Sequence, residues 1–152
     1  MARKSEIRRK TKETDINLSF CVDGSGNANV NTGIGFFNHM LDLFSKHGLF
    51  DLEVYAKGDL DVDAHHTVED VGIVFGQAIK EALGDKKSIK RYGTTFVPMD
   101  EALAMVALDL SGRPFLVFEA SFENSRVGDM DTELIEEFFR AVAFNAGMNL
   151  HI

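Results

Sequence analysis

Residues 65–85, HHTVEDVGIVFGQAIKEALGD, decide the fold, because their apolar side chains recur at helical spacing. The spacing predicts a helix that begins at His65 and ends at Gly84, a residue type that commonly follows the last helical turn. The buried face is predicted to consist of Val68, Val71, Phe75, Ala78, Ile79 and Ala82. The sequence therefore predicts one long amphipathic helix in the middle of the chain.

The segments on either side of this helix alternate between predicted strands and predicted helices. Apolar residues at every second position indicate strands, and apolar residues three and four positions apart indicate helices. A helix over 36–48 carries Phe37, Met40, Leu41 and Phe44 on its apolar side. The other predicted elements are a strand from residue 16, a turn at 24–29, a strand over 49–59, two strands within 101–122 joined by a turn at 111–114, a helix over 131–147 and a strand over 148–152.

The two halves of the chain look like one structural unit repeated. With an offset of about 98 residues, Met40 and Leu41 align with Phe138 and Phe139. We therefore expect a first βα repeat at 1–87 and a second at 88–152, packed together as one compact domain. Only the first repeat continues into a second helix, so the second repeat is predicted to be truncated.

Composition and charge exclude several classes of protein. The 152 residues are 45% apolar, as in an ordinary globular domain, and the net charge of −8 disfavours nucleic acid as a partner. One cysteine, Cys21, rules out an internal disulfide and fits a reducing compartment. We find no signal peptide and no apolar run of the roughly 20 residues that a membrane span needs. The expectation is a cytoplasmic protein without a membrane or nucleic-acid partner.

Two adjacent imidazoles and a carboxylate form the strongest chemical signal. On a helix, His65 and Glu69 share a face, and His66 also neighbours Glu69. The two imidazoles diverge by roughly 100°, so they cannot easily bind one ion together. We expect each to serve a different ion, with the carboxylate between them. Nitrogen and oxygen ligands without a nearby thiolate suit Mn, Fe, Zn or Co.

Other polar residues are weaker candidates. His39 and His47 lie two turns apart on the preceding predicted helix, where they are placed to complete metal shells. The acidic residues just before His65 are expected to cap its helix, to orient imidazoles or to remain solvated. The basic run ending at Arg91 is the best place for a phosphate, and Arg113 is either a second anion contact or a surface turn residue. His151 is more often structural.

At these motifs the chain resembles the imidazoleglycerol-phosphate dehydratase family of histidine biosynthesis. The resemblance runs from about Arg8 to Ile152. It is carried by TGIGFFNHMLDLFSKHG, GDLDVDAHHTVEDVGIVFGQA, KRYGTTFVPMDEALA, LDLSGRP and DTELIEEFFRA. It implies an α+β fold of two similar βα repeats (ribosomal protein S5 domain 2-like), with helices sandwiched between two mixed β-sheets. It also implies two Mn²⁺ ions per site and trimers that assemble into a 24-subunit shell.

The resemblance also implies a role for individual residues. The small phosphorylated imidazole substrate loses water beside its ring, and two metals stabilise that ring as imidazolate, because no carbonyl activates the C–H bond. The implied metal ligands are His39, His65, His66, Glu69 and Glu137. The implied catalytic residues are Glu13, His47 and Glu69. The implied substrate contacts are Glu13, His39, His47, His65, His66, Glu69, Arg91 and Arg113.

Two departures from the family pattern leave alternatives open. The family carries a second HHxxE motif and a Ser-Lys phosphate contact beyond the position of Ile152, and Glu137 stands where some members carry His. Besides a lyase, a metal-dependent hydrolase and a catalytically incomplete subunit therefore remain. In the last case we expect uncovered apolar surface on Ile135, Phe138 and Val142 or on the sheet they cover, and an oligomer smaller than the family's.

Overall fold

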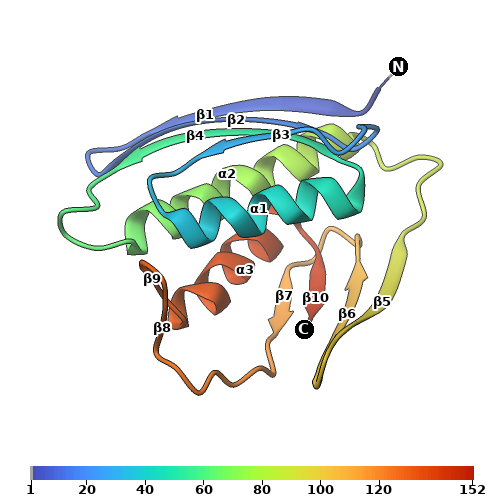
Figure 1. Ribbon diagram of the computed structural model, residues 1–152. Coiled ribbons are helices and arrows are strands. Elements are labelled where there is room, and N and C mark those ends of the chain that lie inside the picture. The colour runs from blue at the N-terminus through green and yellow to red at the C-terminus, as the bar shows by residue number, and fades with distance from the viewer. Residues whose placement is uncertain (1) are drawn as a thin grey trace.

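The structure of the chain is a computed structural model that describes residues 2–152. These residues form three helices and ten strands (Figure 1). The helices are α1 (Gly35–Gly48), α2 (His65–Leu83) and α3 (Glu133–Ala146). The strands are β1 (Lys4–Lys10), β2 (Thr14–Cys21), β3 (Ala28–Asn31), β4 (Asp51–Gly58), β5 (Tyr92–Met99), β6 (Ala102–Asp109), β7 (Phe115–Val117), β8 (Arg126–Val127), β9 (Met130–Asp131) and β10 (Asn149–His151).

Two four-stranded sheets have the same topology. The first has the order β1-β2-β4-β3 and the second β5-β6-β10-β7. In each sheet the third strand pairs antiparallel with the second strand and parallel with the fourth. The helices lie between the two sheets (Figure 1). The predicted α+β class, with helices between two mixed sheets, is confirmed.

The structure also refines the offset between the halves. Helices α1 and α3 each have 14 residues, and their first residues, Gly35 and Glu133, lie 98 positions apart. Strands β2 and β6, which come before these helices, have a different offset. Their last residues, Cys21 and Asp109, occupy equivalent positions because they pair with Asp51 and Asn149, and they lie 88 positions apart. The second half therefore contains ten additional residues between β7 and α3, in the segment that forms the small β8–β9 hairpin.

Helix α2 has the predicted bounds and the predicted buried face. It ends at Leu83, and Gly84 follows with φ 54°. Of the six predicted core residues, five are buried and Ile79 is partly buried. One side of α2 contacts β1 and β2, and the other side packs against α3. This helix therefore belongs to the core of both halves.

Two glycines allow α2 and α3 to approach closely. A Cβ atom on Gly76 would lie 2.6 Å from the carbonyl oxygen of Val142 and 2.7 Å from the Cβ of Asn145. A Cβ on Gly72 would lie 2.9 Å from the carbonyl oxygen of Phe138. Because two of these contacts are with backbone, a side chain here forces the helices apart.

Helix α1 departs from its predicted face. Phe37 and Leu41 are buried, but Met40 and Phe44 are each 38% exposed, so the apolar stripe is wider than the buried one.

Helix α1 begins at Gly35, where Asp129 of the second half accepts hydrogen bonds from the amides of Gly35 (2.8 Å) and Phe36 (3.3 Å). These donors lower the pKa of Asp129, so the cap is a carboxylate, which a helix N-terminus favours.

Several strands were not predicted. Residues of β1, β3 and β5 show no clear alternation of apolar and polar side chains. The strands predicted within 101–122 correspond to β6 and β7, but these two are not neighbours, since β10 lies between them. Among residues 2–152, no helix is both long enough and apolar enough to cross a membrane.

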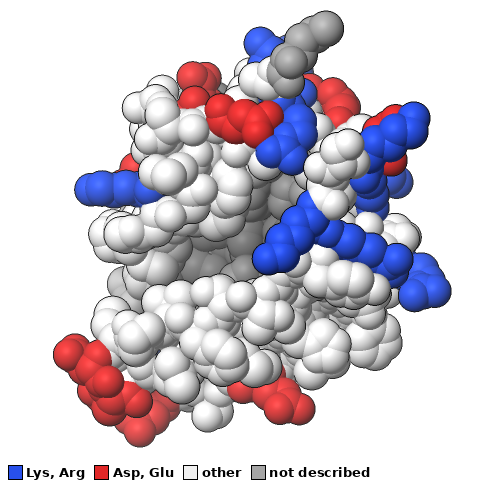
Figure 2. All heavy atoms as spheres, turned by 90° about the vertical axis from the view of Figure 1, so that its right-hand side faces the viewer, with Lys and Arg blue, Asp and Glu red and all other residues white. Residues whose placement is uncertain are grey.

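The expected uncovered surface lies on the second sheet. Phe138 and Val142 are only 8% and 5% exposed because α2 covers them, so naming them as exposed was wrong. On the second sheet, β5 and β6 carry five exposed large apolar residues: Phe96, Val97, Met99, Leu103 and Met105. Figure 2 shows that this side of the molecule is largely uncharged and hollowed, with Lys and Arg gathered along one margin.

Substituting Gly76→Ala is expected to lower the free energy of unfolding by about 1–3 kcal/mol, because overpacking at the helix contact outweighs the roughly 1 kcal/mol gain in helix propensity. Urea denaturation measures the change. The control is Gly35→Ala, whose nearest non-neighbouring atom would lie 3.7 Å away; it should stay within about 0.5 kcal/mol of wild type. Wild-type stability of Gly76→Ala would contradict the close packing.

Candidate functional site

The start of α2 is fixed by the loop that follows β4. The side chain of Asp63 accepts a hydrogen bond from the backbone amide of His65 at 2.8 Å. Acidic residues before His65 were expected to cap the helix; the N-cap residue is Ala64, and Asp63 just before it is the acidic residue that accepts from the first helical amide. The helix therefore presents His65 and His66 in its first turn, where both side chains are almost half exposed.

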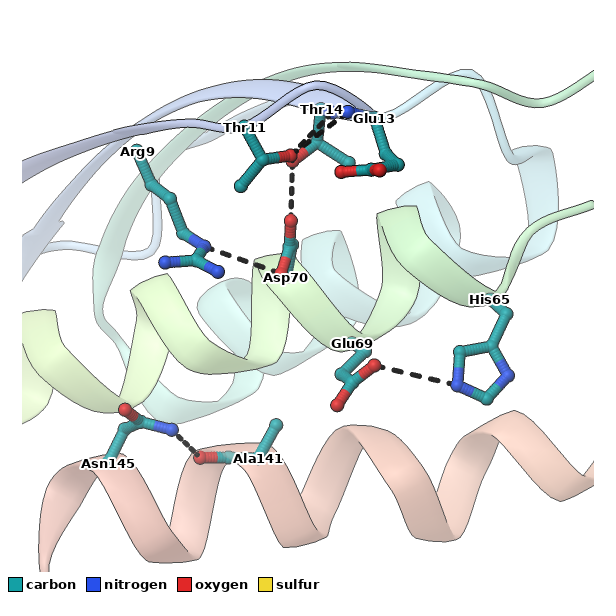
Figure 3. A network of polar contacts seen from close by, with 9 residues as sticks. All are labelled: Arg9, Thr11, Glu13, Thr14, His65, Glu69, Asp70, Ala141 and Asn145. Atoms are coloured by element: carbon teal, nitrogen blue, oxygen red, sulfur yellow. Dashed lines mark hydrogen bonds and ion pairs between the residues drawn. The ribbon is translucent and has the colours of Figure 1, made fainter.

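His65 and Glu69 face each other across one helical turn (Figure 3). The Nε2 atom of His65 lies 3.5 Å from Oε2 of Glu69. Two ligand atoms at about 2.1 Å from a tetrahedral ion are roughly 3.4 Å apart. The pair thus has the spacing of two ligands of a single ion.

His66 has a different carboxylate partner. Its Nδ1 atom lies 2.9 Å from Oδ2 of Asp59, in the loop before the helix. This hydrogen bond is the main cause of the raised pKa of His66, and the charges of Asp59, Glu13 and Asp63 add to it against a smaller desolvation effect. A carboxylate behind one ring nitrogen is the usual support of a metal-binding histidine, because it leaves Nε2 free for the ion.

The two imidazoles are therefore separate, as the helical spacing predicted. Their ring centroids are 6.2 Å apart and the rings are inclined at 74°. Within residues 2–152 no group of three or more His, Cys, Asp or Glu side chains is arranged to hold a metal ion. Each imidazole with its neighbouring carboxylate accordingly forms only part of a metal shell.

The remaining predicted ligands are not part of this group. His39 and His47 are exposed on α1, and Glu137 is half-buried on α3 at the position that corresponds to His39 in the repeat. In the part of the chain that the structure describes, none of these side chains makes a hydrogen bond or ion pair with His65, His66 or Glu69. Glu13 is exposed in the turn between β1 and β2, close enough to influence His66.

Of the two predicted anion-binding arginines, Arg91 is paired with a carboxylate, Asp109. Arg91 donates two hydrogen bonds to Asp109, at 2.6 and 3.1 Å, and its guanidinium lies 5.0 Å from the ring centroid of Tyr92. Arg91 lowers the pKa of Asp109, and the charge of Arg113 contributes to the same shift. A shallow cavity of about 290 Å³ adjoins Asp109 and includes His151 in its lining.

Sequence reasoning missed two acidic residues. Asp109, in the motif LDLSGRP, was not recognised as the partner of Arg91. Asp70, in HHTVED, lies on the buried face of α2 and bonds to Arg9 and Thr14 (Figure 3). A carboxylate between the apolar positions Val68 and Val71 was the signal that identifies Asp70, because a charge on such a face needs partners.

Comparison with known proteins gives the chain a set of close relatives. Residues 32–152 match the family model described as imidazoleglycerol-phosphate dehydratase. The imidazoleglycerol-phosphate dehydratase of Acetivibrio thermocellus is 71% identical over 152 residues, which cover all of this chain and 78% of that protein. The Clostridium kluyveri protein of the same name is 69% identical and matches 97% of this chain and 76% of its own length.

A solved structure gives the same result. The crystal structure of imidazoleglycerol-phosphate dehydratase from Staphylococcus aureus superimposes with a TM-score of 0.86 at 47% identity. The match covers 97% of this chain and 81% of that one. The arrangement of strands and helices described above is therefore shared with that enzyme.

Substituting Asp59→Asn is expected to lower the pKa of His66 in the metal-free protein, because it removes the hydrogen bond and charge that raise it. A raised folded-state pKa stabilises the fold below the unfolded value of about 6.5, and this contribution is lost as pH rises through the folded pKa. The free energy of unfolding of Asp59→Asn should therefore fall furthest below that of wild type at acidic pH. NMR titration of the imidazole and urea denaturation at several pH values measure both effects.

Asp61→Asn is the matched control, since Asp61 is exposed in the same loop and does not contribute to the pKa shift of His66. It should leave the His66 titration unchanged. An unchanged His66 pKa in Asp59→Asn would show that the 2.9 Å contact does not govern this imidazole.

Proposed function

The chain belongs to the imidazoleglycerol-phosphate dehydratase family, and from that premise we propose that it dehydrates imidazole glycerol phosphate to imidazole acetol phosphate in histidine biosynthesis. The observation that carries this proposal is the start of α2, where His65 and His66 diverge and each has its own carboxylate partner. A substrate ring with two nitrogens needs two separate binding positions, and diverging imidazoles supply one component of each.

The donor set fits two Mn²⁺ ions. His65 and Glu69 would hold one ion, and His66, supported by Asp59, would hold the other. Imidazole and carboxylate donors without thiolate suit this metal. When bound, the two ions act as Lewis acids toward the nitrogens of the substrate ring. His39 and Glu137 are proposed as further ligands.

The proton transfers are assigned to this chain's own carboxylates and imidazoles. The C–H bond to be broken has no adjacent carbonyl, so a base alone is inadequate and the base must be held in position. Glu13 is supported for this role by its exposure and its electrostatic effect on His66. His47 and Glu69 are the other proposed proton-transfer residues.

The phosphate is proposed to bind between Arg91 and Arg113. Two guanidinium groups near the same carboxylate leave more positive than negative charge at that position. Charge-assisted hydrogen bonds from arginine suit a phosphate group, which would share or replace Asp109 as the partner of Arg91. His39, His47, His65, His66, Glu13 and Glu69 are the remaining proposed substrate contacts.

We further propose that copies of this chain associate with one another, as the family resemblance implies. Two features support this. The metal-binding pairs within one chain are incomplete shells, so ligands from a neighbouring copy would complete them. In addition, Phe96, Leu103 and Met105 are 60%, 66% and 45% exposed on one face of the β5–β6 pair, and exposed apolar surface of this kind usually marks an interface.

A second candidate is that residues 1–152 by themselves are catalytically incomplete. In the first half, α2 covers β1 and β2 and carries the HHxxE residues. In the second half, β5 and β6 have no equivalent helix among the described residues, and their apolar side chains are exposed. A helix at this position would bring a second set of ligands, which the two-ion mechanism requires.

Substituting His66→Ala should reduce the metal content of the protein by about one of two ions, because one partial shell loses its imidazole. Elemental analysis after loading with Mn²⁺ measures the loss, and circular dichroism checks that the variant is folded. His151→Ala, a histidine substitution far from α2 in the sequence, should keep the full metal content. Equal metal content in both variants would make the assignment of His66 wrong.

Turnover of imidazole glycerol phosphate with Mn²⁺ tests the function directly. Residues 1–152 alone should show little or no dehydration, and the same chain extended at its C-terminus with the part of the Acetivibrio thermocellus relative that it does not match should recover it. Light scattering should show a larger assembly for the extended chain. Release of inorganic phosphate without dehydration would instead indicate a hydrolase. Equal dehydration by both chains would show that the site is complete without that segment.

A further inference from the structure

Asp70 is a charged side chain placed among core residues. It is 9% exposed, and its neighbours on the helix, Val68 and Val71, are fully buried. A buried carboxylate is costly unless its oxygens have partners. Here Oδ2 accepts a hydrogen bond from the hydroxyl of Thr14 at 2.5 Å, and Oδ1 lies 3.3 Å from Nε of Arg9. Both partners come from the β1–β2 hairpin, so this side chain joins α2 to that hairpin.

Thr14 continues this contact into the turn of the hairpin. Its hydroxyl lies 3.2 Å from that of Thr11, which accepts hydrogen bonds from the amides of Glu13 (3.1 Å) and Thr14 (3.0 Å). A backbone hydrogen bond from Thr11 to Thr14 closes the turn at 2.8 Å. A continuous series of polar contacts therefore runs from Asp70 to the backbone of Glu13 (Figure 3).

The same helix turn presents the candidate ligands. Glu69 precedes Asp70 in the chain and points to the other side of α2, toward His65 (Figure 3). Glu13, whose backbone amide is held by Thr11 in the turn, has an exposed side chain. The distance between Glu13 and the ligand residues thus depends on how firmly the turn is held to α2.

Stability alone is a poor explanation for this polar contact. The apolar face of α2 already packs against β1 and β2, and replacing a buried ion pair by apolar groups is often neutral or stabilising. We propose that Asp70, through Thr14, is a positioning residue that holds the β1–β2 turn, and with it Glu13, at a fixed place relative to α2 and the ligand residues of its first turns. We call this attachment of the β1–β2 turn to α2, through Thr14 and Asp70, the clamp. The clamp is independent of the proposed function, whereas its effect on turnover rests on that function.

The clamp is tested by hydrogen exchange in the metal-free protein. Thr14→Val keeps the shape of the side chain and removes the hydroxyl. It should speed exchange of the Glu13 and Thr14 amides by at least about tenfold, while the amides of α2 keep their wild-type rates. Thr14→Ser retains a hydroxyl and should keep exchange near wild type.

Ser5→Ala provides the matched control. The hydroxyl of Ser5 on β1 donates a 2.8 Å hydrogen bond to the carbonyl of Ala78, so it also joins this hairpin to α2, but far from the turn. Its removal should leave the turn amides unchanged. Unchanged turn amides in Thr14→Val, or an equal acceleration of all amides, would overturn the clamp.

The effect on turnover is tested in the extended chain described above. Thr14→Val and Asp70→Asn should each lower kcat at least about tenfold with little change in KM or metal content, since a small misplacement of a reacting group is costly. The loss should disappear in a Glu13→Gln background, because both changes act through the same carboxylate. If Asp70→Asn instead lowers kcat by the same factor in the Glu13→Gln background as in the wild type, Asp70 has a merely structural role. If the wild type dehydrates no substrate, the proposed function fails, and the exchange result still decides the clamp.

Discussion

The close contact between α2 and α3 is the constraint on which the rest of the structure depends. Gly72 and Gly76 have no side chain, so the backbone of one helix approaches the other directly. This contact fixes the rotation of α2 about its own axis. With one side held against α3 and another beneath the first sheet, Asp70 must face the β1–β2 hairpin, and Glu69 points to the opposite side of α2, toward His65. The division of α2 into a buried face and a ligand face is thus set by packing.

The sequence predicted those elements whose periodicity is strong. Helix α2 was predicted with its bounds and buried residues, because a long apolar stripe is hard to mistake. Strand β1 was missed because only Ile7 of its three inward-facing residues is apolar; the other two, Ser5 and Arg9, are polar, so no apolar alternation results. Strand β5 was missed because its side chains are almost all exposed, so polar and apolar positions do not alternate. The insertion of β10 between β6 and β7 is a long-range pairing that no local pattern encodes.

The candidate site shows the same division between local and distant information. The divergence of His65 and His66 follows from helix geometry alone, and it was predicted. The partners of the charged groups come from remote segments: Thr14 lies 56 positions from Asp70, and Arg91 lies 18 positions from Asp109. Helical spacing gives the direction of a side chain but not what it meets. The carboxylate that pairs with Arg91 therefore became visible only in three dimensions, whereas Asp59 was among the acidic residues before His65 that were expected to orient an imidazole.

The ten residues that distinguish the second half from the first make the first half depend on the second. They lie between β7 and α3, in the segment that carries Asp129, and Asp129 accepts hydrogen bonds from the first amides of α1 in the other half. Without the second half, these amides at the start of α1 would lose their carboxylate partner. The repeat is therefore a symmetry of the fold only, because the first half by itself lacks a group that its own helix uses.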